Sequence, residues 1–236
     1  MKKKTIGIIQ PGKLGDLIIC LPIAKYYYDQ GYEVHWPVFS NFAPMMAEVV
    51  DYVKYIPVSN DVYKCVPEAY EYFKKKKPNI LFDIAATFPG SKCTEEYVAL
   101  GDGYGEEKFD QFKYRKCNVP FELKWKLEYK RDLKSEQKVY DDMIKSEKYD
   151  VISTKHSRGD INVRFASKYP IIQVNENYNI FHWRKVLENA KCIGLVDSAM
   201  ANLVEQLNLP NKKVLLRKPG HPTPTFRNEW RIQEVQ

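Results

Sequence analysis

The amino-acid sequence predicts an α/β protein of two lobes, each built on a parallel sheet covered by helices. Short β-branched segments alternate with helical ones over residues 5–85, and the same alternation restarts at residue 149. A polar and charged stretch over residues 121–148 separates the two sets. Strands that alternate with helices form parallel sheets with helical crossovers. We therefore expect an N-terminal lobe at residues 1–135 and a C-terminal lobe at residues 136–236, with a cleft between them.

The first lobe is expected to hold four strands and three long helices. The strands are predicted at residues 5–10, 32–39, 53–58 and 79–85, and the helices at residues 16–30, 42–50 and 62–76. Gly31 ends the first helix, as glycine commonly does just past a helix C-terminus. Pro22 should kink this helix or shift its start. Residues 87–120 lack periodicity and predict loops and short helices.

The second lobe follows the same plan. Strands are predicted at residues 149–154, 170–174, 192–196 and 213–216, and helices at residues 133–147, 161–168, 181–190 and 198–207. Leu203, Val204 and Leu207 fall on one face of the last helix, as packing against a core requires. The tail that follows predicts an irregular connector, with Phe226 and Trp230 as anchors on the first lobe.

Composition narrows the classes of partner. The chain has 37 Lys and Arg against 30 Asp and Glu, a net charge of +7, which favours phosphates, nucleotides, acidic glycans or a peripheral contact with an anionic membrane. Charge and aromatic content alone do not make a nucleic-acid module, so no nucleic-acid partner is expected. Five cysteines without a CxxC pair predict free thiols in a cytoplasmic protein. No run approaches the roughly 20 apolar residues that cross a bilayer.

The turn after the first strand is the first candidate site. It reads Pro11-Gly12-Lys13-Leu14-Gly15-Asp16-Leu17 and opens a helix. Residues at such a turn lie at the carboxyl edge of a parallel sheet, where ligands bind in open α/β folds. The turn matches neither the GxGxxG nor the GxxxxGK[ST] pattern, so it predicts no dinucleotide or P-loop site. Asp16 is then either a functional carboxylate or a partner of the helix dipole.

The turn after a later strand is the second candidate site. Gly194-Leu195-Val196 leads into Asp197-Ser198-Ala199-Met200, where another helix begins. Free N–H groups at a helix start bind anions. Asp197 and Ser198 are also ordinary N-cap residues, and from spacing alone capping is as good an interpretation as ligand binding.

Together the two turns resemble the signatures of the heptosyltransferase-like glycosyltransferases, the ADP-heptose:lipopolysaccharide heptosyltransferase superfamily. The two segments that show this resemblance are IGIIQPGKLGDLIICLPIAKYYYDQGYEVHW and VLENAKCIGLVDSAMANLVEQLNLP. The resemblance covers about a third of the chain and implies a short, divergent member with two Rossmann-like lobes of the GT-B type. It further implies a nucleotide-diphosphate sugar as donor on the C-terminal lobe and a glycan or glycolipid acceptor on the N-terminal lobe.

The resemblance also assigns residues. Asp16 falls on the family's general base, with Gly12, Lys13 and Gly15 in the acceptor-side turn. The remaining positions are those for the nucleotide sugar: Asp197, Ser198, Ala199, Met200 and Asn202 near the phosphates, Lys155 or Arg158 as the phosphate-neutralising cation, and Glu176 at the ribose.

Two departures and one absence shape the expected activity. Ala199 replaces a family Gly and Asn202 replaces a family His, which suggests as an alternative a non-catalytic nucleotide- or glycan-binding module. No Asp-x-Asp occurs in the chain, so we expect no metal and no cofactor. Direct attack with one base predicts inversion at the anomeric carbon.

Overall fold

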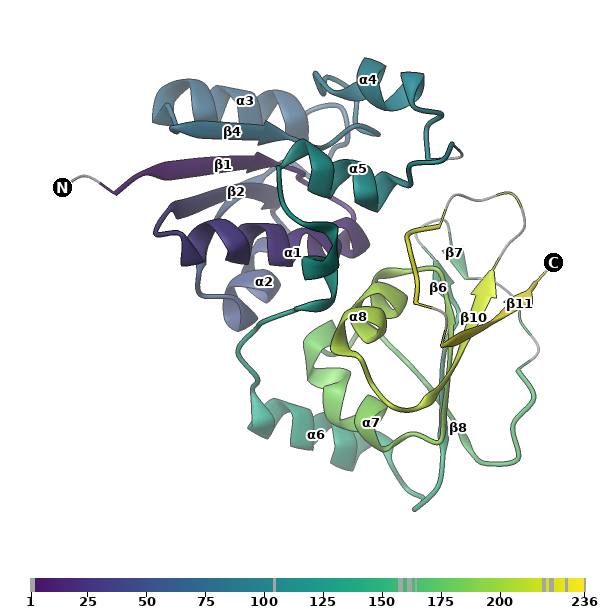
Figure 1. The fold of residues 1–236 in the computed structure, drawn as a ribbon. Helices are drawn as coiled ribbons and strands as arrows, with labels where there is room; N and C mark the ends of the chain where they lie inside the picture. The colour runs from purple at the N-terminus through teal and green to yellow at the C-terminus, as the bar shows by residue number, and fades with distance from the viewer. Residues whose placement is uncertain are drawn as a thin grey trace. The chain divides into compact units, whose positions relative to one another are not determined.

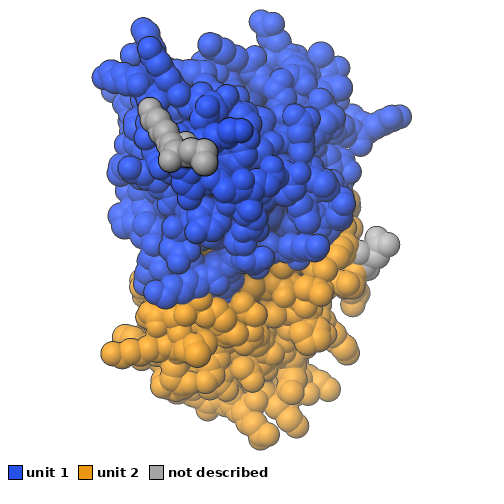
Figure 2. Space-filling model, turned by 60° about the vertical axis from the view of Figure 1, so that its left-hand side comes forward, with its two compact units in different colours: residues 1–130, 222–225 blue, residues 131–221, 226–236 orange. Residues whose placement is uncertain are grey.

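The computed structural model describes residues 3–103, 105–156, 159–160, 163, 165–217, 220, 223–227 and 229–235. The chain divides into two compact units (Figure 2). Unit 1 comprises residues 1–130 and 222–225, and unit 2 comprises residues 131–221 and 226–236. Each unit has its own parallel sheet. The predicted fold class, α/β with two parallel sheets, is confirmed.

Unit 1 is built on four parallel strands in the order β3-β2-β1-β4 (Figure 1). The strands are β1 (Thr5–Ile9), β2 (Glu33–Phe39), β3 (Val53–Val58) and β4 (Ile80–Asp83). Between them run α1 (Leu14–Asp29), α2 (Ala43–Val49) and α3 (Cys65–Lys76). Pro22 lies inside α1, which continues beyond it to Asp29.

Close packing explains the small residue in β1. Side chains alternate between the two faces of a strand, and Ile6 and Ile8 are fully buried on one face. Gly7 lies on the other, where a Cβ atom would come within 2.5 Å of the Phe73 ring. Helix α3 therefore packs directly against the backbone of the central strand.

Residues 87–120, which lack periodicity in the sequence, contain two short helices, α4 (Thr94–Ala99) and α5 (Phe109–Lys116). The 3-10 helix η1 (Phe121–Trp125) follows them. A buried ion pair joins the last two. Lys124 Nζ lies 2.6 Å from Asp110 Oδ2, and both side chains are fully buried. The returning segment is tied to this pair, because Thr225 N donates to Asp110 and Thr225 O accepts from Lys124.

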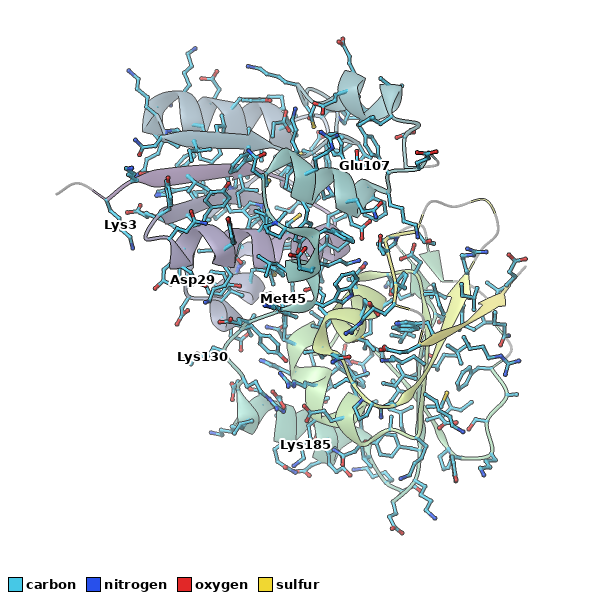
Figure 3. All side chains as sticks on the ribbon, in the orientation of Figure 1. Lys3, Asp29, Met45, Glu107, Lys130 and Lys185 are labelled. Atoms are coloured by element: carbon cyan, nitrogen blue, oxygen red, sulfur yellow. The ribbon has the colours of Figure 1, made fainter. Side chains whose placement is uncertain are left out.

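Unit 2 has five parallel strands in the order β11-β10-β9-β5-β8. They are β5 (Asp150–Ser153), β8 (Ile171–Gln173), β9 (Cys192–Val196), β10 (Lys212–Arg217) and β11 (Trp230–Glu234). The helical elements are α6 (Leu133–Met143), η2 (Ile180–Trp183), α7 (Arg184–Asn189) and α8 (Ala199–Leu207). A short antiparallel pair, β6 (Lys155–His156) and β7 (Gly159–Asp160), follows β5. Lys185 of α7 donates to Gln137 of α6 (Figure 3).

Two predictions for the second lobe were wrong. The described residues of the 161–168 segment are not helical. Trp230 does not anchor the tail on the first lobe; it begins β11, stacks edge-on against Phe226 and donates to Glu205 of α8 at 2.6 Å. None of the helices that the structure describes has the length and hydropathy to cross a membrane.

We expect Lys124→Met to destabilise unit 1 strongly. The substitution leaves Asp110 buried without its cation, a change that costs about 3–5 kcal/mol. The measurement is the free energy of unfolding in urea. Lys138→Met serves as the control, because Lys138 pairs with Asp142 on an exposed helix surface and such pairs contribute little. Equal losses in the two variants would contradict a structural role for the buried pair.

Candidate functional site

The strand order of each sheet marks where a ligand is expected. In unit 1 the chain adds β2 and β3 on one side of β1 and then β4 on the other, so the order reverses between β1 and β4. In unit 2 the corresponding reversal lies between β5 and β9. Open parallel sheets bind ligands outside the carboxyl ends of the strands at such a switch point.

Asp16 lies in the first turn of α1, directly after the carboxyl end of β1. Its amide donates to Lys13 O at 2.9 Å, and its side chain is 16% exposed. Lys13 precedes the helix with φ 54° and ψ 114°, a conformation that residues with a Cβ rarely adopt. Strained backbone concentrates at functional sites, and here it directs the start of α1.

A buried lysine fills the switch point of unit 1. Lys113 of α5 is 5% exposed. Its Nζ lies 3.3 Å from Asp16 Oδ1 and donates to Gln10 Oε1 and, at 3.0 Å, to Ile84 O. Gln10 follows β1 and Ile84 follows β4, so the ammonium joins the ends of the two strands between which the order reverses.

The electrostatics of this pair favour charge on the lysine. Burial is the largest single influence and lowers the pKa of Lys113, but the charge and hydrogen bonding of Asp16, together with the neighbouring Cys20 and Cys93, leave the pKa of Lys113 raised. The neighbouring Cys20 thiol is fully buried, which raises its pKa to about 12. Cys20 is therefore an unreactive thiol at neutral pH.

Gly12 has a packing role in the turn. A Cβ atom there would lie 2.3 Å from Cζ of Phe39, the last residue of β2. The turn is also fixed by two hydrogen bonds, from Gln10 Nε2 to Gly12 O at 2.9 Å and from Phe39 N to Pro11 O at 2.7 Å. The three residues predicted for the acceptor-side turn are differently placed: Gly12 is buried, Lys13 is exposed and Gly15 lies inside the first turn of α1.

Asp83 shapes the same edge of the sheet. It ends β4 and accepts hydrogen bonds from Ser91 Oγ at 2.8 Å and Lys92 N at 2.6 Å, and from Ala85 N at 3.1 Å. These bonds fold the loop over residues 84–93 back onto the strand end. Asp83 is therefore a loop anchor, with its oxygens already engaged.

In unit 2 the start of α8 lies at the carboxyl end of β9. Ser198 is in the N-cap position with extended backbone, yet its side chain makes no capping hydrogen bond. Among the residues described, Ser198 Oγ has no hydrogen-bond partner although the atom is buried. The first N–H groups of a nine-residue helix also lack intrahelical acceptors. The capping interpretation of the Ser198 side chain is therefore wrong, and its buried hydroxyl is without a partner among the residues described.

The other predicted phosphate contacts gather at the same helix start. Asp197, Ala199 and Met200 flank Ser198, and Asn202 lies one turn on, 4% exposed, with Nδ2 donating to Ser198 O at 3.0 Å. Gly194 does not leave room for a ligand. A Cβ atom on it would come within 2.4 Å of the Phe165 ring, which fills this space.

Two residues from neighbouring strand ends also meet. Lys155 Nζ donates to Glu176 Oε2 at 2.7 Å, with both side chains largely exposed. Lys155 follows β5 and Glu176 follows β8, and these strands pair in the sheet. The structure thus brings together the cation predicted for the phosphates and the carboxylate predicted for the ribose. Arg158, the alternative cation, lies outside the described residues.

Sequence reasoning missed Gln10, Asp83 and Lys113. Gln10 ends a predicted strand and Asp83 lies two residues before the end of another, and a polar residue near a strand end was the available signal. Lys113 had none, because it lies in the aperiodic stretch and lysine is almost never fully buried unless it is paired.

Solved structures share this fold. A scan against protein-family models and a search among curated protein sequences find no match. The glycosyl transferase family 9 protein of Veillonella parvula DSM 2008 is similar with a TM-score of 0.60 at 10% identity, over 99% of this chain and 86% of that one. ADP-heptose LPS heptosyltransferase II of E. coli is similar with a TM-score of 0.53 at 11% identity, over 98% of this chain and 90% of that one. E. coli heptosyltransferase WaaC with ADP-2-deoxy-2-fluoro heptose is similar with a TM-score of 0.50 at 13% identity, over 97% of this chain and 92% of that one.

This chain has the GT-B fold of the heptosyltransferases. The expectation drawn from the two sequence signatures is confirmed at the level of fold, and identities of 10–13% carry it no further.

We expect Gly12→Ala to destabilise unit 1 by about 1–3 kcal/mol, because the added methyl group forces the Phe39 ring or the turn to move. Phe39→Leu removes the ring, so the double variant should lose less stability than the sum of the two single variants. Urea unfolding of the four proteins measures this coupling. Additive losses would contradict the contact as the reason for glycine at this position.

Proposed function

We propose that this chain is a glycosyltransferase that moves a sugar from a nucleotide-diphosphate sugar to a hydroxyl of a glycan or glycolipid. The observation that carries the proposal is the position of Asp16. Its carboxylate lies at the switch point of unit 1, beside a buried cation. The start of α8 at the switch point of unit 2, where Ser198 Oγ has no partner among the described residues, and the shared fold support it.

The donor site is assigned to unit 2. The diphosphate binds the first N–H groups of α8 together with Ser198 Oγ, since a helix N-terminus with free donors favours anions. Lys155 supplies a positive charge for the phosphates and Glu176 accepts hydrogen bonds from the ribose. Their mutual ion pair is exposed, so a ligand can replace it at small cost.

Asp16 acts as general base in unit 1. As the acceptor oxygen forms its bond to the anomeric carbon, its O–H bond breaks and the proton passes to an Asp16 oxygen. The bond between the anomeric carbon and the diphosphate oxygen breaks, and its electron pair leaves with the nucleoside diphosphate. A single direct displacement inverts the configuration at the anomeric carbon.

The leaving diphosphate is stabilised by protein groups in this proposal. Donors directed at the position where charge develops stabilise the transition state. Helix α8 and Lys155 provide them, and the sequence lacks the Asp-x-Asp pair that holds a metal ion in many glycosyltransferases. The proposed reaction is therefore metal-independent.

Ala199 and Asn202 support one alternative, a non-catalytic module that binds nucleotides or glycans. Ala199 adds a methyl group at the helix start, and Asn202 carries no charge. Both changes affect the donor side and leave Asp16 untouched. Nucleotide binding without transfer would favour the alternative.

Ser198→Ala tests the donor site. Losing a hydrogen bond to a charged phosphate costs about 1.5–3 kcal/mol, so ADP should bind about 10- to 100-fold more weakly by calorimetry. Stability should not fall, because Ser198 Oγ has no partner among the described residues. Asp132→Ala is the control: Asp132 caps α6, so this variant should lose stability and keep ADP affinity. The reverse pattern for Ser198→Ala would restore the capping interpretation.

Asp16→Asn tests the chemistry. General-base help contributes about 10²–10⁴-fold, and transfer or slow donor hydrolysis should fall by that factor with ADP affinity unchanged. Asp29→Asn is the matched control at the other end of α1, where Asp29 pairs with Lys25 on the surface. An Asp16→Asn protein with full activity would refute the assignment of the base.

A further inference from the structure

Lys113 is a buried cation that the proposed reaction leaves without a role. Its side chain is 7% exposed, and its ammonium group is surrounded by the Gln10 side-chain oxygen, the Ile84 carbonyl and the Asp16 carboxylate. An ammonium has three N–H donors, and three protein oxygens surround this one. No donor is left over for a substrate.

The contacts of Lys113 reach every segment that positions Asp16. Gln10 begins the turn that leads to α1, and its amide group also donates to Gly12 O. Ile84 follows β4, the strand on the other side of the switch point. Lys113 itself is carried by α5, so three segments far apart in sequence, which are the turn after β1, the end of β4 and α5, converge on one ammonium group.

We propose that Lys113 is a positioning residue for Asp16, which holds the carboxylate at the switch point in its charged, proton-accepting form. The inference rests on the proposed function, because it gives Lys113 a task only if Asp16 acts as a base. It goes beyond that function in naming a residue on a helix that shares no sequence motif with Asp16.

The charges of the pair explain why the lysine is useful there. Burial lowers the pKa of Lys113, and the charge of Asp16 is the largest of the influences that raise it. When Asp16 takes the acceptor proton, the pair passes from no net charge to one positive charge. The ammonium therefore favours the charged carboxylate, the form of Asp16 that can accept a proton.

A double-mutant cycle tests the inference with four proteins: the wild type, Lys113→Met, Asp16→Asn and the double variant. We expect Lys113→Met to lower kcat by about 10²-fold, the cost of a base displaced by about 1 Å, with ADP affinity unchanged. In the Asp16→Asn background the same substitution should have no further effect on transfer. Lys113→Met as active as the wild type would overturn the inference while the function of Asp16 stands.

Lys116→Met is the matched control. Lys116 lies on the same helix and pairs with a carboxylate, Glu96, but it is partly exposed and remote from the strand ends. This variant should keep the wild-type kcat. An equal loss of kcat in Lys116→Met and Lys113→Met would show that α5 acts through stability alone and would overturn the inference.

A lysine titration gives a readout that needs no activity. In protein labelled with ¹³C at lysine Cε, the Lys113 signal is identified by its loss in Lys113→Met. It should titrate above the ordinary lysine value of about 10.4 in the wild type, and at a lower pH in Asp16→Asn, where burial is no longer opposed by that carboxylate. An identical titration in both proteins would overturn the pairing. If the wild type transfers no sugar but the titration shifts, the proposed function fails and the pairing stands.

Measurements of the free energy of unfolding show whether a loss of activity in the double-mutant cycle comes from a loss of stability. Each single variant leaves one buried charge without its partner, whereas the double variant removes both charges. The double variant should therefore be more stable than Asp16→Asn in urea. A double variant less stable than both single variants would contradict the pairing.

Discussion

The arrangement of unit 1 depends on how one buried ammonium group is compensated. A lysine removed from water is tolerated only where oxygen atoms and an opposite charge replace its hydration. At Lys113 the oxygens come from the ends of β1 and β4 and the charge comes from Asp16. Because all three oxygen-bearing groups contact the same ammonium, the turn after β1, the end of β4 and the start of α1 cannot move independently. The strained backbone of Lys13 lies in the middle of this constraint.

The same constraint separates the roles of the two sheets. A switch point ordinarily offers an open crevice to a nucleotide, but in unit 1 the side chain of Lys113 occupies it. In unit 2 the corresponding point has a helix start with free N–H groups and an unpaired Ser198 hydroxyl among the described residues. Unit 2 is thus the one suited to a diphosphate, and unit 1 presents a carboxylate. This difference is what the proposed division between donor and acceptor requires.

Much of the fold could be predicted from sequence because its strands are buried and local. The strands Val53–Val58 and Cys192–Val196 were predicted to the residue. Strand β11 was missed, because it is a polar edge strand whose only strong signal is Trp230. The Gly-Asp turn could be found from its position after a strand. Its partner Lys113 could not, since 97 positions separate them and no periodicity marks α5. The buried Ser198 hydroxyl, which has no partner among the described residues, could not be predicted either, because serine at a helix start predicts a cap.

The residue one turn into α8 bears on how the proposed donor site would respond to pH. The resemblance to the heptosyltransferase-like proteins implies a histidine where this chain has Asn202, and histidine is the side chain whose charge changes near neutral pH. Asn202 is uncharged at every pH and its amide is already engaged with Ser198 O. In the proposed donor site the attraction of α8 for a diphosphate would therefore come from fixed dipoles, with a permanent charge from Lys155, which follows the neighbouring strand β5. Affinity for a nucleoside diphosphate should then follow the ionisation of the phosphate itself rather than that of a protein group. Such a site would lack the charge that a protonated histidine supplies. Its affinity for the diphosphate would therefore not fall as a histidine loses its proton near neutral pH.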